Sequence, residues 1–125
     1  MEFFLGHAAT GVYYQFMFDC GNENGAGDVL FDAKGYDSSW NGTWKRRVKR
    51  YPDKWSAIVK VPLDEIGLNI TENNRLLFQA VRGKSYDSGT RTPKGEPRML
   101  REMASWNGGW VHQMDSFGEL TLNQN

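Results

Sequence analysis

Two pairs of tryptophans are the residues of this sequence best suited to chemistry. They are Trp40 and Trp44 in segment 36–44, and Trp106 and Trp110 in segment 105–110. Both segments consist largely of Gly, Asn, Asp and Ser, so their own side chains cannot easily bury an indole. An exposed indole beside polar groups suits a sugar, because the C–H face of a pyranose packs on the ring while its hydroxyls form hydrogen bonds. The alternative is that these rings cap the ends of a hydrophobic core.

The residues that most often carry catalysis form no recognisable arrangement. His7 and His112 fall at strand ends or in loops, and their spacing supports no Ser-His-Asp or Cys-His set. Cys20 could be a nucleophile, but it follows an apolar strand and is better explained as a small residue at the core edge. Asp64 and Glu65 open a predicted helical turn, where acids favour the N-terminus. The sequence therefore predicts a protein that is not an enzyme.

Metal and cofactor signals are weak. Asp28, Asp32 and Asp37 could supply oxygen ligands to calcium, but their spacing matches no known calcium loop, and solvated loop acids explain them better. The chain has no zinc-type ligand spacing and no glycine-rich phosphate loop. We expect no required cofactor, and structural calcium stays open.

The basic run 45–50, flanked by Trp44 and Tyr51, is the best signal for nucleic-acid binding. Against it, 15 Lys and Arg balance 15 Asp and Glu, which gives a net charge of zero. Charged edge strands also block association between sheets. We predict no nucleic-acid or membrane partner, since both depend on a surplus of basic charge.

The elements that must position these residues are short strands, because apolar residues recur with a period of two. The predicted strands are 2–5, 12–18, 29–33, 45–50, 55–61, 76–82 and 117–122, with a helical turn at 63–68 and a long loop at 83–97. The length of 125 residues fits one domain, 1–125, and no apolar run is long enough to span a bilayer. The predicted fold is all-β, an antiparallel β-sandwich of jelly-roll or immunoglobulin-like type.

Several segments resemble, in order, the motifs of family 9 carbohydrate-binding modules and the related DOMON-type sandwiches. They are Glu2-Phe3-Phe4-Leu5, Tyr13-Tyr14-Gln15-Phe16, Phe31-Asp32-Ala33, Trp55-Ser56-Ala57 with Val61-Pro62-Leu63 and Ile66-Gly67, Phe78-Gln79-Ala80-Val81-Arg82, and Ser105-Trp106 with His112 and Phe117-Gly118-Glu119-Leu120. Their order over residues 2–122 carries the resemblance more than any one piece does.

The resemblance implies non-catalytic binding of a plant-type polysaccharide, such as xylan or cellulose, or of its oligosaccharides, by a tryptophan clamp. Trp106 matches the tryptophan of the closing motif, and Trp40 or Trp44 would form the opposite jaw. Gln79 and Arg82 match the strand that approaches the binding face, and Trp110 is a further candidate. Such modules accompany extracellular glycoside hydrolases, so an extracellular or periplasmic location is expected, although the start of the chain lacks the features of a signal peptide.

Some family features are missing. Gly6 stands where the first strand is usually followed by Asp, and Val59 or Lys60 where the central motif has Glu. The strands that precede the first motif in the family are also absent, so the sandwich could lack N-terminal strands and expose part of its core. A homodimer is the simplest cover for such a gap. The alternative function is a reduced sandwich that acts as a structural or protein-interaction module and has lost sugar binding.

Overall fold

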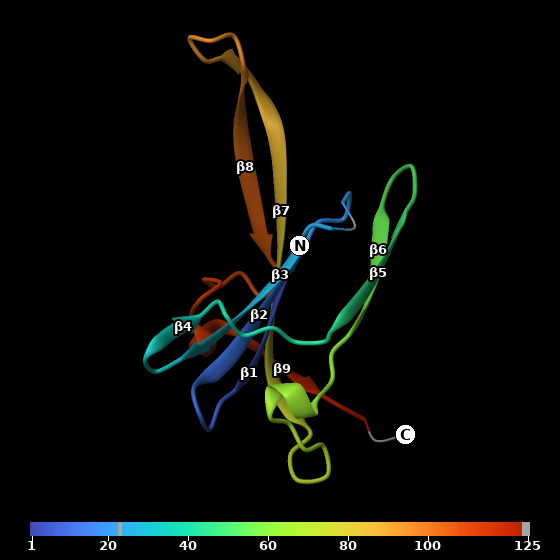
Figure 1. Cartoon of the computed structure of the whole chain (residues 1–125), viewed down its shortest axis with the longest axis vertical. Helices are drawn as coiled ribbons and strands as arrows, with labels where there is room; N and C mark the ends of the chain where they lie inside the picture. Colours follow the sequence, from blue (N-terminus) through green and yellow to red (C-terminus); the bar gives the residue numbers. More distant parts are fainter. Residues whose placement is uncertain (23, 124–125) are drawn as a thin grey trace.

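The computed structural model describes residues 1–22 and 24–123 and has an all-β, antiparallel, sandwich-like fold (Figure 1). The strands are β1 (Glu2–His7), β2 (Val12–Phe18), β3 (Ala26–Asp32), β4 (Gly35–Asp37), β5 (Lys45–Arg50), β6 (Trp55–Lys60), β7 (Arg75–Arg91), β8 (Pro97–Ser105) and β9 (Gly118–Thr121). Two short 3₁₀ turns, η1 (Asp64–Ile66) and η2 (Met114–Ser116), complete the secondary structure. Among these residues no helix has the length and apolar character needed to cross a membrane.

The main sheet has the strand order β4-β3-β2-β1-β7-β8, and β9 pairs with the first part of β7. The β1–β2 register sets Phe3 opposite Phe16. These two rings stack with their centroids 4.7 Å apart. The predicted strand 12–18 is confirmed with both of its ends, and so is its alternation, since Tyr14, Phe16 and Phe18 are buried in one cluster.

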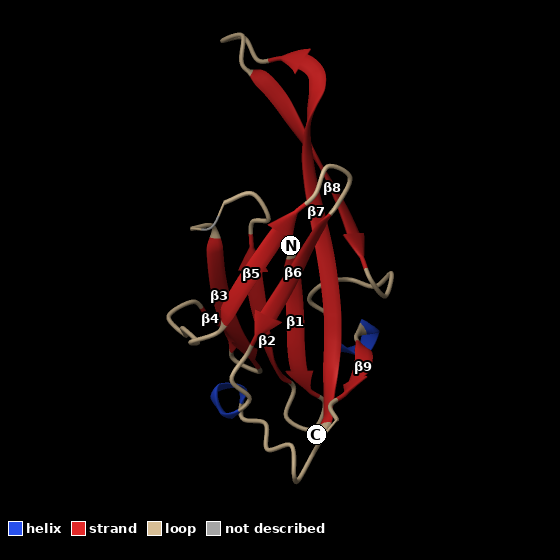
Figure 2. Ribbon diagram, turned by 90° about the vertical axis from the view of Figure 1, so that its right-hand side faces the viewer, coloured by secondary structure: helices blue, strands red, loops and turns tan. Residues whose placement is uncertain are grey.

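The second layer is the two-stranded sheet β5–β6, which lies across one face of the main sheet (Figure 2). We call this covered face of the main sheet the inner face, and its opposite the outer face. Trp55, Ala57 and Val59 of β6 pack against the inner-face core, as predicted from their alternation. The helical turn that follows is confirmed: Ile66 is 1% exposed in this core, and Gly67 ends the turn at φ 69°.

The second layer covers only part of the inner face. An apolar groove of about 410 Å³ remains between β6 and the pair β7–β9. Its lining includes Val59 and Val61 on the β6 side and Phe78, Leu120 and Leu122 on the other. In the part of the chain that the structure describes, β6 pairs with β5 alone, so its other edge is open.

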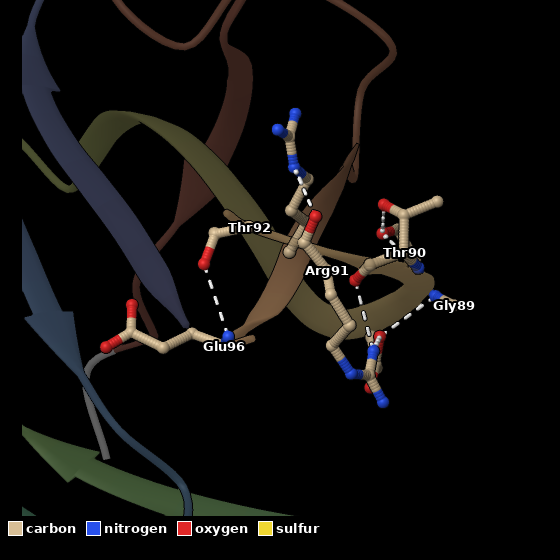
Figure 3. Close-up of polar contacts among 8 residues, drawn as sticks. Gly89, Thr90, Arg91, Thr92 and Glu96 are labelled. Carbon is tan, nitrogen blue, oxygen red and sulfur yellow. Dashed lines mark hydrogen bonds and ion pairs between the residues drawn. The ribbon is translucent and has the colours of Figure 1, made fainter. Parts of the chain in front are cut away.

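Strands β7 and β8 continue beyond the sheet as a projecting hairpin, which we call the arm (Figure 1). The predicted loop at 83–97 is therefore wrong, because β7 runs to Arg91 and β8 begins at Pro97. Short polar contacts hold the tip, where Glu96 N donates to Thr92 Oγ1 at 3.2 Å (Figure 3). Close by, Arg91 forms an ion pair with Asp87 at 2.9 Å. Both faces of the arm are solvated, so no apolar alternation marks these strands in the sequence.

The outer face carries a second, smaller core. Phe4, Val81 and Phe117 are buried there, and the segment that joins β8 to β9 folds over them. The same segment contains Trp106 and Trp110, so this core fixes the path of the chain between the two tryptophans.

Candidate functional site

Trp40 and Trp44 lie on the inner face, but both are packed into the core. The ring centroid of Trp40 is 4.9 Å from that of Tyr14 and 5.9 Å from that of Phe16. The ring of Trp44 meets Phe16 edge-on, with the centroids 5.3 Å apart. Both indoles are half-buried. The polar segment does not bury them through its own side chains; the aromatic side chains of β2 do, so the capping alternative describes these two residues.

Asp28 of β3 anchors the segment that carries these two rings. Its Oδ2 atom accepts hydrogen bonds from Trp44 Nε1 at 2.7 Å and from the backbone N–H of Gly42 at 3.0 Å. A second carboxylate also holds this segment: Glu65 Oε2 accepts a hydrogen bond from Thr43 N at 2.6 Å. Asp28 therefore ties the segment to β3 of the main sheet, and Glu65 ties it to the turn η1.

Replacing Asp28 with alanine is expected to lower the free energy of unfolding by about 2–3 kcal/mol, because two hydrogen bonds to a charged acceptor are lost and the indole N–H keeps no partner. Urea denaturation followed by circular dichroism measures the change. Asp28→Asn keeps an acceptor oxygen and should cost less. Asp53→Ala, at the exposed tip of the β5–β6 hairpin, is the matched control and should stay within about 0.5 kcal/mol of the wild type. Equal values for Asp28→Ala and Asp53→Ala would contradict the anchoring role.

Trp106 is an exposed aromatic platform on the inner face. The residue is 63% exposed, yet its ring rests against Phe78 with the centroids 5.5 Å apart. The same ring covers Gly118, where a Cβ atom would lie 2.5 Å from Cζ3 of Trp106. The backbone is held as well, since Trp106 N donates to Ala80 O at 2.8 Å. One side of the ring is therefore fixed on the protein while much of its surface faces solvent.

Arg82 lies beside this platform. Arg82 pairs with Ala104 in the β7–β8 register, so it is one diagonal step from Trp106 and shares its face of the sheet. Diagonal neighbours of this kind stand about 7–8 Å apart, within reach of long side chains. The structure thus brings together two of the predicted ligand-binding residues, Trp106 and Arg82.

Gln79 has a different place. Its side chain is 0% exposed on the outer face, and Oε1 accepts from the backbone N–H of Asn107 at 3.2 Å and from that of Ala80 at 3.0 Å. Its Nε2 atom has no hydrogen-bond partner among the residues described. Gln79 therefore positions the start of the segment after Trp106, and we expect no direct ligand contact from it.

Trp110 points away from Trp106. The residue is 76% exposed and lines a shallow hollow of about 260 Å³ with Val81, Met103 and Ser105. Val81 belongs to the outer-face core, so the two tryptophans of the closing segment lie on opposite faces of the sheet. Trp40 shares the face of Trp106 but packs on β2, two strands or about 10 Å across the sheet from β7. Neither Trp110 nor Trp40 is therefore placed as a second jaw facing Trp106.

The groups considered for metal binding or catalysis are separate. The described residues contain no group of three or more His, Cys, Asp or Glu side chains placed to hold a metal ion. Asp28 is engaged by Trp44, while hydrogen bonds from Ser39 lower the pKa of Asp37. Burial raises the pKa of the Cys20 thiol, which is unfavourable for a thiolate nucleophile.

Sequence reasoning named Trp106 but missed the groups that hold it, Phe78 and Gly118. The sequence identified Gly118 only as part of the closing motif, because a sequence does not show which aromatic ring packs over a glycine. Compared with protein-family models, curated proteins and solved structures, the chain matches none of them.

Proposed function

We propose that this protein binds carbohydrate without catalysing a reaction, and that Trp106 with Arg82 forms the core of the site. The observation that carries the proposal is the state of Trp106: the residue is 63% exposed, yet its indole is fixed against Phe78 and Gly118. An ordered, solvated flat ring can stack on the C–H face of a pyranose at little entropic cost.

Arg82 supplies the polar half of the interaction. Its guanidinium presents several N–H donors to sugar hydroxyls one diagonal step from the ring. Each such bond replaces one to water, so modest affinity is expected. The ordered motifs that resemble family 9 carbohydrate-binding modules support the same function. Plant-type polysaccharides such as xylan or cellulose, and a place beside an extracellular or periplasmic glycoside hydrolase, remain part of the proposal.

The test compares Trp106→Ala with Trp110→Ala in titrations with xylo- and cello-oligosaccharides, followed by calorimetry and tryptophan fluorescence. The two tryptophans are similarly exposed and lie four residues apart, so they form a matched pair. Trp106→Ala is expected to weaken binding at least about tenfold, which corresponds to about 1.4 kcal/mol. Trp110→Ala should leave the affinity within about twofold of the wild type. Equal affinities for Trp106→Ala and the wild type would refute the site.

A second candidate function rests on the groove beside β6. In this candidate function the protein is a reduced sandwich that acts as an interaction module, and a second copy of the chain covers the apolar surface of the groove. It is favoured by the open β6 edge and by the apolar lining of the groove. Exposed edges and apolar surfaces of this kind are common sites of association.

This candidate predicts a dimer in sedimentation experiments. Leu122→Glu, which places a charge in the groove, should give monomers. Ile58→Glu is the control, because Ile58 is 75% exposed and alternates with the groove-lining residues of β6; it should leave the dimer intact. A wild-type chain that is monomeric at every concentration tested would exclude this candidate.

A further inference from the structure

A crevice of about 870 Å³ lies where three hairpins diverge. Its walls are the ends of β2 and β3, the tip of the β5–β6 hairpin and the part of β7 that leaves the sheet for the arm. Figure 1 shows these three hairpins around the N-terminus. The volume is within the usual range for sites that bind small molecules.

The crevice contains more positive than negative side chains. Its cations are Arg50, Arg82, Lys84 and Arg101, and its acids are Asp19 and Glu2. Both acids are engaged: Glu2 accepts from Arg101 at 3.2 Å and from Gln15 Nε2 at 3.1 Å, and Asp19 accepts from Gly21 N at 2.6 Å. Within the described part of the chain, Arg50, Arg82 and Lys84 form no ion pair. Three cations therefore remain available to an anion.

The crevice also has an aromatic wall. Trp55 pairs with Arg50 across the hairpin, and its ring meets Phe18 edge-on with the centroids 6.5 Å apart. On the other side, the missing side chain of Gly83 leaves room for Arg101, whose Nη2 would be 3.0 Å from a Cβ atom there. This passage lets Arg101 reach Glu2, so the arginine neutralises the acid on that wall of the crevice.

The crevice shares Arg82 with the Trp106 platform. Arg82 and Lys84 alternate along β7 on the face that carries Trp106, with successive side chains about 6.7 Å apart. Glu102, opposite Lys84, is the acid on this face at the base of the arm. A chain of sugars that stacks on Trp106 and runs along β7 would therefore meet Arg82, then Lys84, and then Arg50 across the crevice.

We propose that, among plant-type polysaccharides, the preferred ligand is an acidic oligosaccharide rather than neutral xylan or cellulose, and that this crevice binds its carboxylate groups. The inference rests on the proposed function and adds the substrate class. Arginine suits the task because its guanidinium can bind a carboxylate with two parallel hydrogen bonds. A single-stranded nucleic acid would also offer rings and negative charges, but the chain has no surplus of basic residues to drive such binding.

The test measures the ratio of affinities for oligogalacturonates and for xylo-oligosaccharides of equal length. The acidic ligand should bind at least about tenfold more tightly at 50 mM NaCl, and the difference should shrink at 500 mM, because salt screens exposed charges. Arg50→Gln and Lys84→Gln should each lower the ratio several-fold. Arg98→Gln, an equal change of charge near the arm tip, should leave the ratio unchanged.

The outcomes separate this inference from the proposed function. Equal binding of neutral and acidic ligands, unaffected by Arg50→Gln, would overturn the inference and leave the platform standing. Acidic binding that depends on Arg50 but not on Trp106 would support the crevice and refute the platform. Tighter binding of an oligothymidylate than of the uronate, again dependent on Arg50, would overturn the assignment to a glycan. The absence of binding by every probe at millimolar concentration would overturn both.

Discussion

Replacing Phe16 with alanine is expected to lower the free energy of unfolding by about 3–5 kcal/mol. The Phe16 side chain is 0% exposed and stacks on Phe3 with the centroids 4.7 Å apart. It also meets Trp40 and Trp44 edge-on, so its removal takes contacts from three other rings. The resulting cavity would lie between the two sheets, where neither layer can close it without moving the other. Urea denaturation followed by circular dichroism measures the loss.

Two further variants keep this prediction testable if Phe16→Ala fails to fold. Phe16→Leu retains most of the buried volume and should be destabilised less, with the same sign. Ile58→Ala removes an apolar side chain that is 75% exposed and should change the stability by no more than about 0.5 kcal/mol. A cost for Phe16→Ala as small as that for Ile58→Ala would mean that the inner-face core is not packed as described.

Gly118→Ala is expected to remove carbohydrate binding about as effectively as Trp106→Ala, at least about tenfold. The added Cβ would lie 2.5 Å from Cζ3 of Trp106, closer than any van der Waals contact allows, so the indole must leave its place on β9. Gly118 has no positive φ, and the ring is therefore the main obstacle to the substitution. The Trp106 indole N–H resonance reports the displacement, and titration with xylo-oligosaccharides reports the loss of affinity.

Gly27→Ala is the matched control for this experiment. Its Cβ would make an ordinary contact of 3.6 Å with Cε of Met17, so the indole resonance of Trp106 should not move. If Gly118→Ala shifts the Trp106 resonance while the affinity stays unchanged, the position of this ring does not determine binding.

The strands that bury one face could be predicted from sequence. Strands β2 and β5 have the predicted bounds, because apolar and polar residues alternate in the first, and a basic run bounded by a turn marks the second. The arm could not be predicted. Both faces of its strands are exposed to water, so no apolar pattern marks them. Without a buried face, a single sequence also does not indicate the register in which the two strands pair. The short strand β4, with all three residues exposed, was missed for the same reason.

The candidate site was predictable in part. Composition identified polar segments rich in tryptophan, but composition cannot show which rings an adjacent sheet will cover. Trp40 and Trp44 meet the aromatic residues of β2, whereas Trp106 meets a glycine and keeps its surface open. Gln79 aligned with a binding strand by motif, yet the alternation of β7 directs it to the buried outer face.

The length of β7 has a consequence for backbone motion. This single strand has 17 residues: its first part contains the buried Leu76, Gln79 and Val81, and its second part runs exposed through the arm. The rate of amide hydrogen exchange should therefore differ between the two parts of this one continuous strand. The amides near Val81 should exchange only when the whole domain opens, and those near Tyr86 through local opening of the arm. Arg82 and Lys84 stand at the boundary between these two regimes, so a ligand that binds both would extend slow exchange outward along the arm.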